Sequence, residues 1–145
     1  FHYIFDPKFQ YPGIPKINRY SIKKNENISI ADIDIEPIEV MHYKLPVLGF
    51  KIDGFAYITD AKTIEDSQKK KLNNLDVLVI NALRIKQHMS HFNLEEAIEL
   101  IKELKPKKAI LTHISHFMGI HQDVQKKLPE NIYLAYDGLK IKLNQ

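Results

Sequence analysis

The chain has 145 residues, 44% of them hydrophobic and 27% charged, which is the composition of a globular protein and excludes disordered and membrane-spanning classes. The formal net charge is only +3, and acidic residues are interleaved among the lysines, so we expect a solvated surface rather than a nucleic-acid patch. The absence of cysteine excludes disulfides and zinc–thiolate sites, so any metal must be bound by histidine and carboxylate. We expect a cytoplasmic protein that does not associate with membranes.

The amino-terminal third combines an irregular segment with short strands. Residues 1–20 are rich in aromatic residues and proline, which favours equally an arm packed on a surface and a lid over a substrate. From residue 28, isoleucines alternate with polar residues but change face near Ala31, so we predict two short strands with a kink or bulge there and a break at Pro37. A further short strand, 38–41, ends on His42.

Two strands, 47–52 and 55–59, are separated by Asp53 and Gly54, a pair typical of a tight hairpin turn, and the second strand ends on Asp60. Thr63 with Asp66 three residues later predicts a capped helix to about Leu72.

The remainder alternates strands and helices. Strand 76–80 ends on Asn81, and Asn93 with Glu96 predicts a capped helix that stops before Pro106. An apolar strand at 108–112 ends on His113, and a short helix is expected at 119–128. The last predicted elements are a strand at 132–136 and its hairpin partner at 139–143.

Several predicted strands end on a polar residue, which suggests that polar groups line one rim of a sheet. Three of these residues, His42, Asp60 and His113, are of the types that bind zinc, manganese or iron, and one carboxylate can bridge two metals. A pair of metals can lower the pKa of a shared water and hold a phosphoryl oxygen. Three side chains cannot complete two metal coordination shells, so further ligands are required from elsewhere.

The strings ILTHISH (110–116) and YITD (57–60), with the segment from His42 to Lys44, resemble the carboxyl-terminal half of the metallo-β-lactamase fold, in its PhnP-like phosphodiesterase branch. The resemblance covers roughly residues 38–143. It implies an α/β protein that forms half of a four-layer αββα sandwich. It also implies that His42 binds one metal, His113 the other, and that Asp60 bridges both.

The same resemblance implies a catalytic role for His91, which precedes Leu94 by three residues at a helix start, in binding the substrate phosphate or acting as general acid. His116 is a possible second-sphere partner of the metals. The ending Tyr136, Asp137, Gly138 and Ile141 matches a closing pattern of the family and is expected to be structural.

The chain lacks the HxHxDH motif that supplies the remaining ligands in this family, and it begins at Phe1 rather than methionine. We therefore expect residues 1–145 to be a single domain from the carboxyl-terminal portion of a longer enzyme. Its missing amino-terminal half would be its principal partner. The intact enzyme is expected to hold two divalent ions, zinc or manganese, whereas these residues alone would bind metal weakly and be inactive.

The expected activity is hydrolysis of a small phosphodiester by metal-bound hydroxide. Two alternatives stay open: an RNA-processing nuclease of the same fold, and a metal-free α/β interaction module whose rim residues are caps and turns. A homodimer is also possible.

Overall fold

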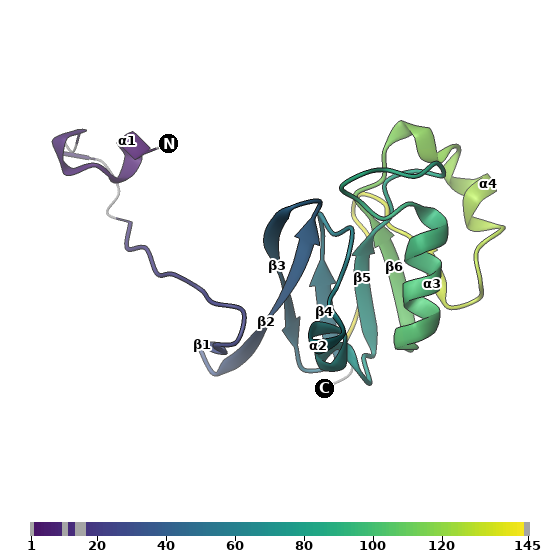
Figure 1. Cartoon of the computed structure of the whole chain (residues 1–145), viewed down its shortest axis with the longest axis horizontal. Helices are drawn as coiled ribbons and strands as arrows, with labels where there is room; N and C mark the ends of the chain where they lie inside the picture. Colours follow the sequence, from purple (N-terminus) through teal and green to yellow (C-terminus); the bar gives the residue numbers. More distant parts are fainter. Residues whose placement is uncertain (1, 10–11, 14–16, 144–145) are drawn as a thin grey trace.

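The computed structural model describes residues 2–9, 12–13 and 17–143, and these form one seven-stranded sheet whose strands follow one another in chain order (Figure 1). The strands are β1 (Ile28–Ile30), β2 (Ile33–His42), β3 (Leu45–Ile52), β4 (Phe55–Ile58), β5 (Val77–Asn81), β6 (Lys108–Thr112) and β7 (Ile132–Leu134). The first four strands pair antiparallel, whereas β4 to β7 pair parallel. The sheet is therefore mixed.

The connections contain short helices and one longer one. They are α1 (His2–Phe5), η1 (Pro7–Phe9), α2 (Asp66–Lys69), η2 (Lys70–Leu72), α3 (Leu94–Leu104), η3 (His116–Met118) and α4 (His121–Gln125). Within the described residues, no helix has the length and apolar character needed to cross a bilayer.

The main core lies between the sheet and α3. Alternate residues of β5 and β6 face α3, whose apolar stripe completes the cluster; the buried members from these elements are Leu78, Ile80, Ala97, Leu100, Ile101, Leu104, Ala109 and Leu111. The opposite face carries a smaller cluster of Val77, Val79 and Ile110, against which Leu139 and Ile141 pack. Figure 1 shows α2 and α3 in front of the sheet. This is the expected α/β class, with one sheet and one helical layer of an αββα sandwich.

Two local signals are confirmed. Asp53 and Gly54 form the turn between β3 and β4, whose register pairs Ile52 with Phe55. Asn93 caps α3 through a complete capping box, in which its side chain accepts from the Glu96 backbone N–H at 2.8 Å and the Glu96 carboxylate accepts from the Asn93 N–H at 2.9 Å. Both signals depend only on near neighbours in sequence.

The predicted kink at Ala31 and break at Pro37 are wrong. Ala31 and Asp32 both have positive φ, of 48° and 68°, and form the tight turn of a β1–β2 hairpin. The pairing of β1 with β2 ends at Ile35, so the edge of β2 that faces away from β3 has no strand partner at Pro37. On that edge Lys71 Nζ donates to the Pro37 carbonyl, at 3.2 Å. A residue's N–H and C=O point to the same side of a strand, so the missing N–H of proline breaks no pairing with β3.

Three further predictions need correction. Thr63 does not cap a helix but bridges to Met41, and α2 begins at Asp66. The helix expected at 119–128 is shorter, at 121–125, and is preceded by η3. Residues 139–143 form no strand; instead Leu139 and Ile141 pack on the smaller apolar cluster, and within the described part of the chain β7 pairs only with β6. Apolar alternation did not distinguish a strand from a segment packed on the sheet.

The predicted arm, residues 1–20, lies partly outside the described residues, at positions 1, 10–11 and 14–16. Its described part contains α1 and η1, which Figure 1 draws at a distance from the sheet, and exposed residues such as Tyr20. Its role as an arm or a lid stays a prediction.

Candidate metal centre

The sheet topology brings the predicted metal ligands to one edge. Strand β2 is antiparallel to β3, which is antiparallel to β4, so β2 runs in the same direction as β4, β5 and β6. Their carboxyl ends therefore meet at one rim, the usual place for ligands in open α/β sheets. His42 is the last residue of β2, Asp60 follows β4, and His113 follows β6.

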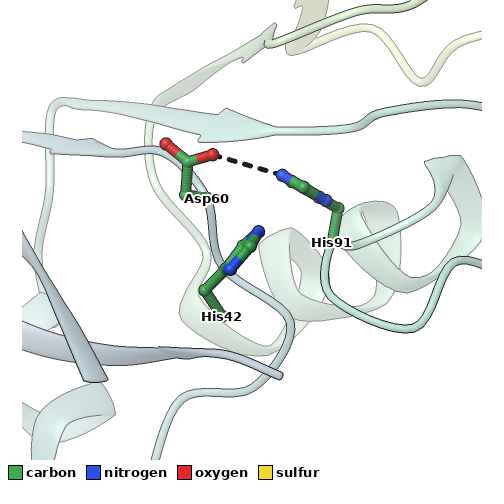
Figure 2. Close-up of side chains that lie close together, drawn as sticks. All are labelled: His42, Asp60 and His91. Atoms are coloured by element: carbon green, nitrogen blue, oxygen red, sulfur yellow. Dashed lines mark hydrogen bonds and ion pairs between the residues drawn. The ribbon is translucent and has the colours of Figure 1, made fainter. Parts of the chain in front are cut away.

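The side chains converge at this rim (Figure 2). Ligand atoms of His42, Asp60 and His91 all lie within 4.8 Å of one another. Asp60 Oδ1 lies 3.2 Å from His91 Nε2 and 3.6 Å from His113 Nε2. The ring of His91 stacks on that of His113, with centroids 4.8 Å apart, and meets the edge of His42 at 4.6 Å. Asp60 is thus surrounded by imidazoles from three separate segments.

His91 reaches the site from the loop between β5 and α3. Its side chain is only 10% exposed, whereas those of Asp60 and His113 are 44% and 38% exposed. On its inner side, His91 Nδ1 lies 3.0 Å from Ser90 Oγ and 3.2 Å from His88 Nδ1. His91 is therefore the member of the group whose position is most restricted by packing.

The backbone is strained at two of these positions. Asp60 and His113 have φ of 55° and 56°, in the left-handed region that residues with a Cβ seldom adopt. Such conformations cost roughly 1–3 kcal/mol and cluster at functional sites. His113 turns the chain immediately after β6, and Asp60 does so two residues after the end of β4.

The electrostatics favour an ionised carboxylate beside neutral imidazole. Partial burial acts to raise the pKa of Asp60, but the hydrogen bond from His91, the nearby His113 and a hydrogen bond from Thr59 outweigh it and hold that pKa below its ordinary value. Burial lowers the pKa of His91, although the hydrogen bond to Asp60 opposes this effect. Both groups are thus in the protonation states required of metal ligands at neutral pH.

The donor set fits a divalent transition metal. Neutral imidazoles and a carboxylate suit zinc, manganese or iron, with bonds of about 2.0–2.2 Å for zinc. The ligand atoms of His42, Asp60 and His91 lie within 4.8 Å of one another, slightly more than the roughly 4.0–4.4 Å that two such bonds can span, so holding one ion would draw these side chains closer together. Asp60 offers two carboxylate oxygens, of which Oδ1 lies nearest to His91 and His113.

Other histidines divide into one group at the site and one away from it. His116 is exposed, and its ring packs on Phe117 at 3.9 Å; among the described residues, no polar contact joins it to the centre. His88 is partly buried against His91. Sequence reasoning missed Ser90, whose only signal was its place between these two histidines.

Comparison with known proteins identifies the family and the fold. The family model described as "Beta-lactamase superfamily domain" matches residues 2–114. An octanoyltransferase from Porphyromonas gingivalis is 37% identical over 145 residues, which are 99% of this chain and 29% of that protein. The chain therefore spans less than a third of that relative.

Solved structures extend the comparison. A diphosphatase of the PhnP family is 34% identical to this chain, with a TM-score of 0.80. The match covers 83% of this chain and 47% of the diphosphatase chain. YhfI from Bacillus subtilis, a metallo-β-lactamase fold protein, is 22% identical, with a TM-score of 0.71. The match covers 91% of this chain and 58% of the YhfI chain. Human tRNase Z, short form, shares the fold at 18% identity and a TM-score of 0.62. The match covers 81% of this chain and 46% of the tRNase Z chain. The chain belongs to the beta-lactamase superfamily domain family, with a metallo-β-lactamase fold of the PhnP-like branch.

Proposed function

We propose that the complete protein is a metal-dependent hydrolase that cleaves a phosphodiester or diphosphate bond in a small substrate. The observation that carries this proposal is the convergence of His42, His91 and His113 on the Asp60 carboxylate. The 34% identity to a PhnP-family diphosphatase supports the choice of a phosphate substrate. Because the chain spans about half of that protein, the activity is proposed for the complete polypeptide.

In this proposal His42 and His113 would each hold one divalent ion, and Asp60 would be shared between them. Divalent ions in such a site act as Lewis acids toward a phosphoryl oxygen and lower the pKa of a coordinated water. The described residues supply fewer ligands than two ions require, so the remaining ligands are expected from the upstream half.

The proposed role of His91 follows from its hydrogen bond. An ionised carboxylate only accepts hydrogen bonds, so His91 Nε2, at 3.2 Å from Asp60 Oδ1, carries the hydrogen. That N–H faces the centre, where a phosphoryl or leaving-group oxygen would replace Asp60 as its acceptor. Burial of the ring keeps this donor oriented before substrate arrives.

The test uses the complete native polypeptide loaded with Zn²⁺ or Mn²⁺. Metal content is measured by elemental analysis, and hydrolysis is followed with bis(p-nitrophenyl) phosphate and a dinucleoside diphosphate. Asp60→Asn and His113→Ala should lose both metal and activity. His91→Gln should retain metal and lose about 10²–10³-fold in kcat, the range typical of a missing oriented hydrogen-bond donor.

The exposed His121, whose ring lies 6.3 Å from that of Tyr136 and which is not among the residues grouped around Asp60, provides the matched control. His121→Ala should leave both metal content and rate unchanged. Full activity in Asp60→Asn would refute the proposed metal site. A wild-type protein that neither binds metal nor hydrolyses any of these substrates would favour a metal-free interaction module. Loss of metal in His91→Gln would instead make His91 a ligand.

The relationship to an octanoyltransferase favours a second candidate, hydrolysis of an acyl ester or thioester. The same metals would polarise a carbonyl oxygen. Faster hydrolysis of an octanoyl thioester than of either phosphate substrate would select this candidate. Cleavage of a structured RNA would select the nuclease alternative; the likeness to human tRNase Z supports its fold alone.

A further inference from the structure

We infer that Asn81 is a positioning residue of the metal centre. Its buried carboxamide holds the backbone of Ala61, which connects the segments that carry Asp60 and His91. The inference rests on the proposed metal-dependent function and names a residue that touches neither metal nor substrate. Asn81 ends β5 and is fully buried, at 0% exposure.

The Asn81 side chain forms two hydrogen bonds to a single backbone unit. Its Oδ1 accepts from the Ala61 N–H at 2.8 Å, and its Nδ2 donates to the Ala61 carbonyl at 3.0 Å. Ala61 directly follows Asp60. These two bonds therefore define where the chain goes immediately after the proposed bridging ligand.

The Ala61 carbonyl also accepts from the Phe92 N–H at 2.8 Å. Phe92 directly follows His91. One carbonyl thus joins the segments that present Asp60 and His91, and the Asn81 carboxamide holds that carbonyl in place. A displacement of the Ala61 carbonyl would therefore move the side chains of both Asp60 and His91.

The other ligands are tied to neighbouring segments through backbone bonds. Met41, beside His42, accepts from the Lys62 N–H at 2.7 Å, and Thr112, beside His113, accepts from the Ala82 N–H at 3.0 Å. Asn81 differs because a side chain makes the connection, so substitution can remove it.

The residue type follows from the local backbone. Strand β4 ends at Ile58, and the left-handed turn at Asp60, with φ of 55°, takes Ala61 out of the sheet register. Ala61 is fully buried, so its N–H and C=O need partners inside the protein. A carboxamide offers a donor and an acceptor on one short planar group, which a carboxylate or an apolar side chain does not.

The experiment compares Asn81→Leu and Asn81→Asp with wild type in the complete polypeptide. Asn81→Asp is nearly isosteric and keeps the acceptor for Ala61 while losing the donor, so it keeps the test decisive if Asn81→Leu does not fold. Leu78→Ala is the matched control, since it removes a fully buried side chain from the same strand, three residues from the rim. Zn²⁺ affinity is measured by chelator competition, and the Co²⁺ visible spectrum reports ligand geometry.

We expect the Asn81 variants to bind Zn²⁺ about 10–100-fold more weakly, the usual effect of losing an outer-sphere support, with an altered Co²⁺ spectrum. Leu78→Ala should be less stable but keep the wild-type affinity and spectrum. Wild-type affinity in Asn81→Asp, or an equal loss in Leu78→Ala, would overturn the inference and leave the proposed function standing. Failure of the wild-type protein to bind Zn²⁺ would overturn both.

Discussion

Replacing His113 by glycine should leave a more stable metal-free protein than replacing it by alanine, because φ at this position is 56°. Both variants lose the same imidazole, so their difference isolates the effect of a Cβ. A Cβ in the left-handed region costs roughly 1–2 kcal/mol. Glycine in turn gives up about 0.4–1 kcal/mol through the greater freedom of its unfolded chain. The net preference is about 0.5–1 kcal/mol in favour of glycine.

The adjacent residue provides a control with the opposite sign. Thr112 is the last residue of β6, pairs with Asn81 and has no positive φ, so glycine there should be less stable than alanine by roughly 0.5–1 kcal/mol. Urea unfolding of the four metal-free variants measures both differences. If glycine is the less stable residue at both positions, the left-handed turn at His113 is not a source of strain, and the reasoning is refuted.

Two further predictions concern pH and the capping of α3. Burial lowers the pKa of His91 below its ordinary value of 6.5, so the unfolded chain takes up this proton at a higher pH than the folded chain does. The metal-free protein should therefore lose stability as the pH falls through 6.5 and below; urea midpoints across this range should fall less in His91→Gln, and equal slopes would contradict the assignment. Asn93→Ala removes the capping box and a 3.2 Å bond to the Ile85 carbonyl, and should cost about 0.5–2 kcal/mol by thermal unfolding. The exposed Glu95→Ala should change stability by less than about 0.5 kcal/mol, and equal effects of the two would argue against the cap.

The candidate site could be predicted in part because its residues end strands. An apolar run that stops on a polar residue is visible in sequence at His42, Asp60 and His113, and the alternation of strands and helices indicates that such ends share a rim. Their metal roles came from resemblance to a family and stay proposals. Asn81 also ends a predicted strand, but its partner Ala61 lies 20 residues away in sequence, so the pattern gave no sign of this hydrogen bond. Ser90 contacts the adjacent His91, but it ends no strand and so carried no such signal.

The sequence by itself determined the elements whose causes are local. The capping box at Asn93 and the turn at Asp53 and Gly54 are set by residues two to three positions apart, so they form as predicted. Tertiary structure alone decided that β2 continues through Pro37 and that 139–143 is not a strand, since both depend on what the rest of the chain places alongside. It also decided the 3.2 Å approach of His91 to Asp60, because a contact between residues 31 positions apart is fixed by the packed sheet rather than by either residue's neighbours.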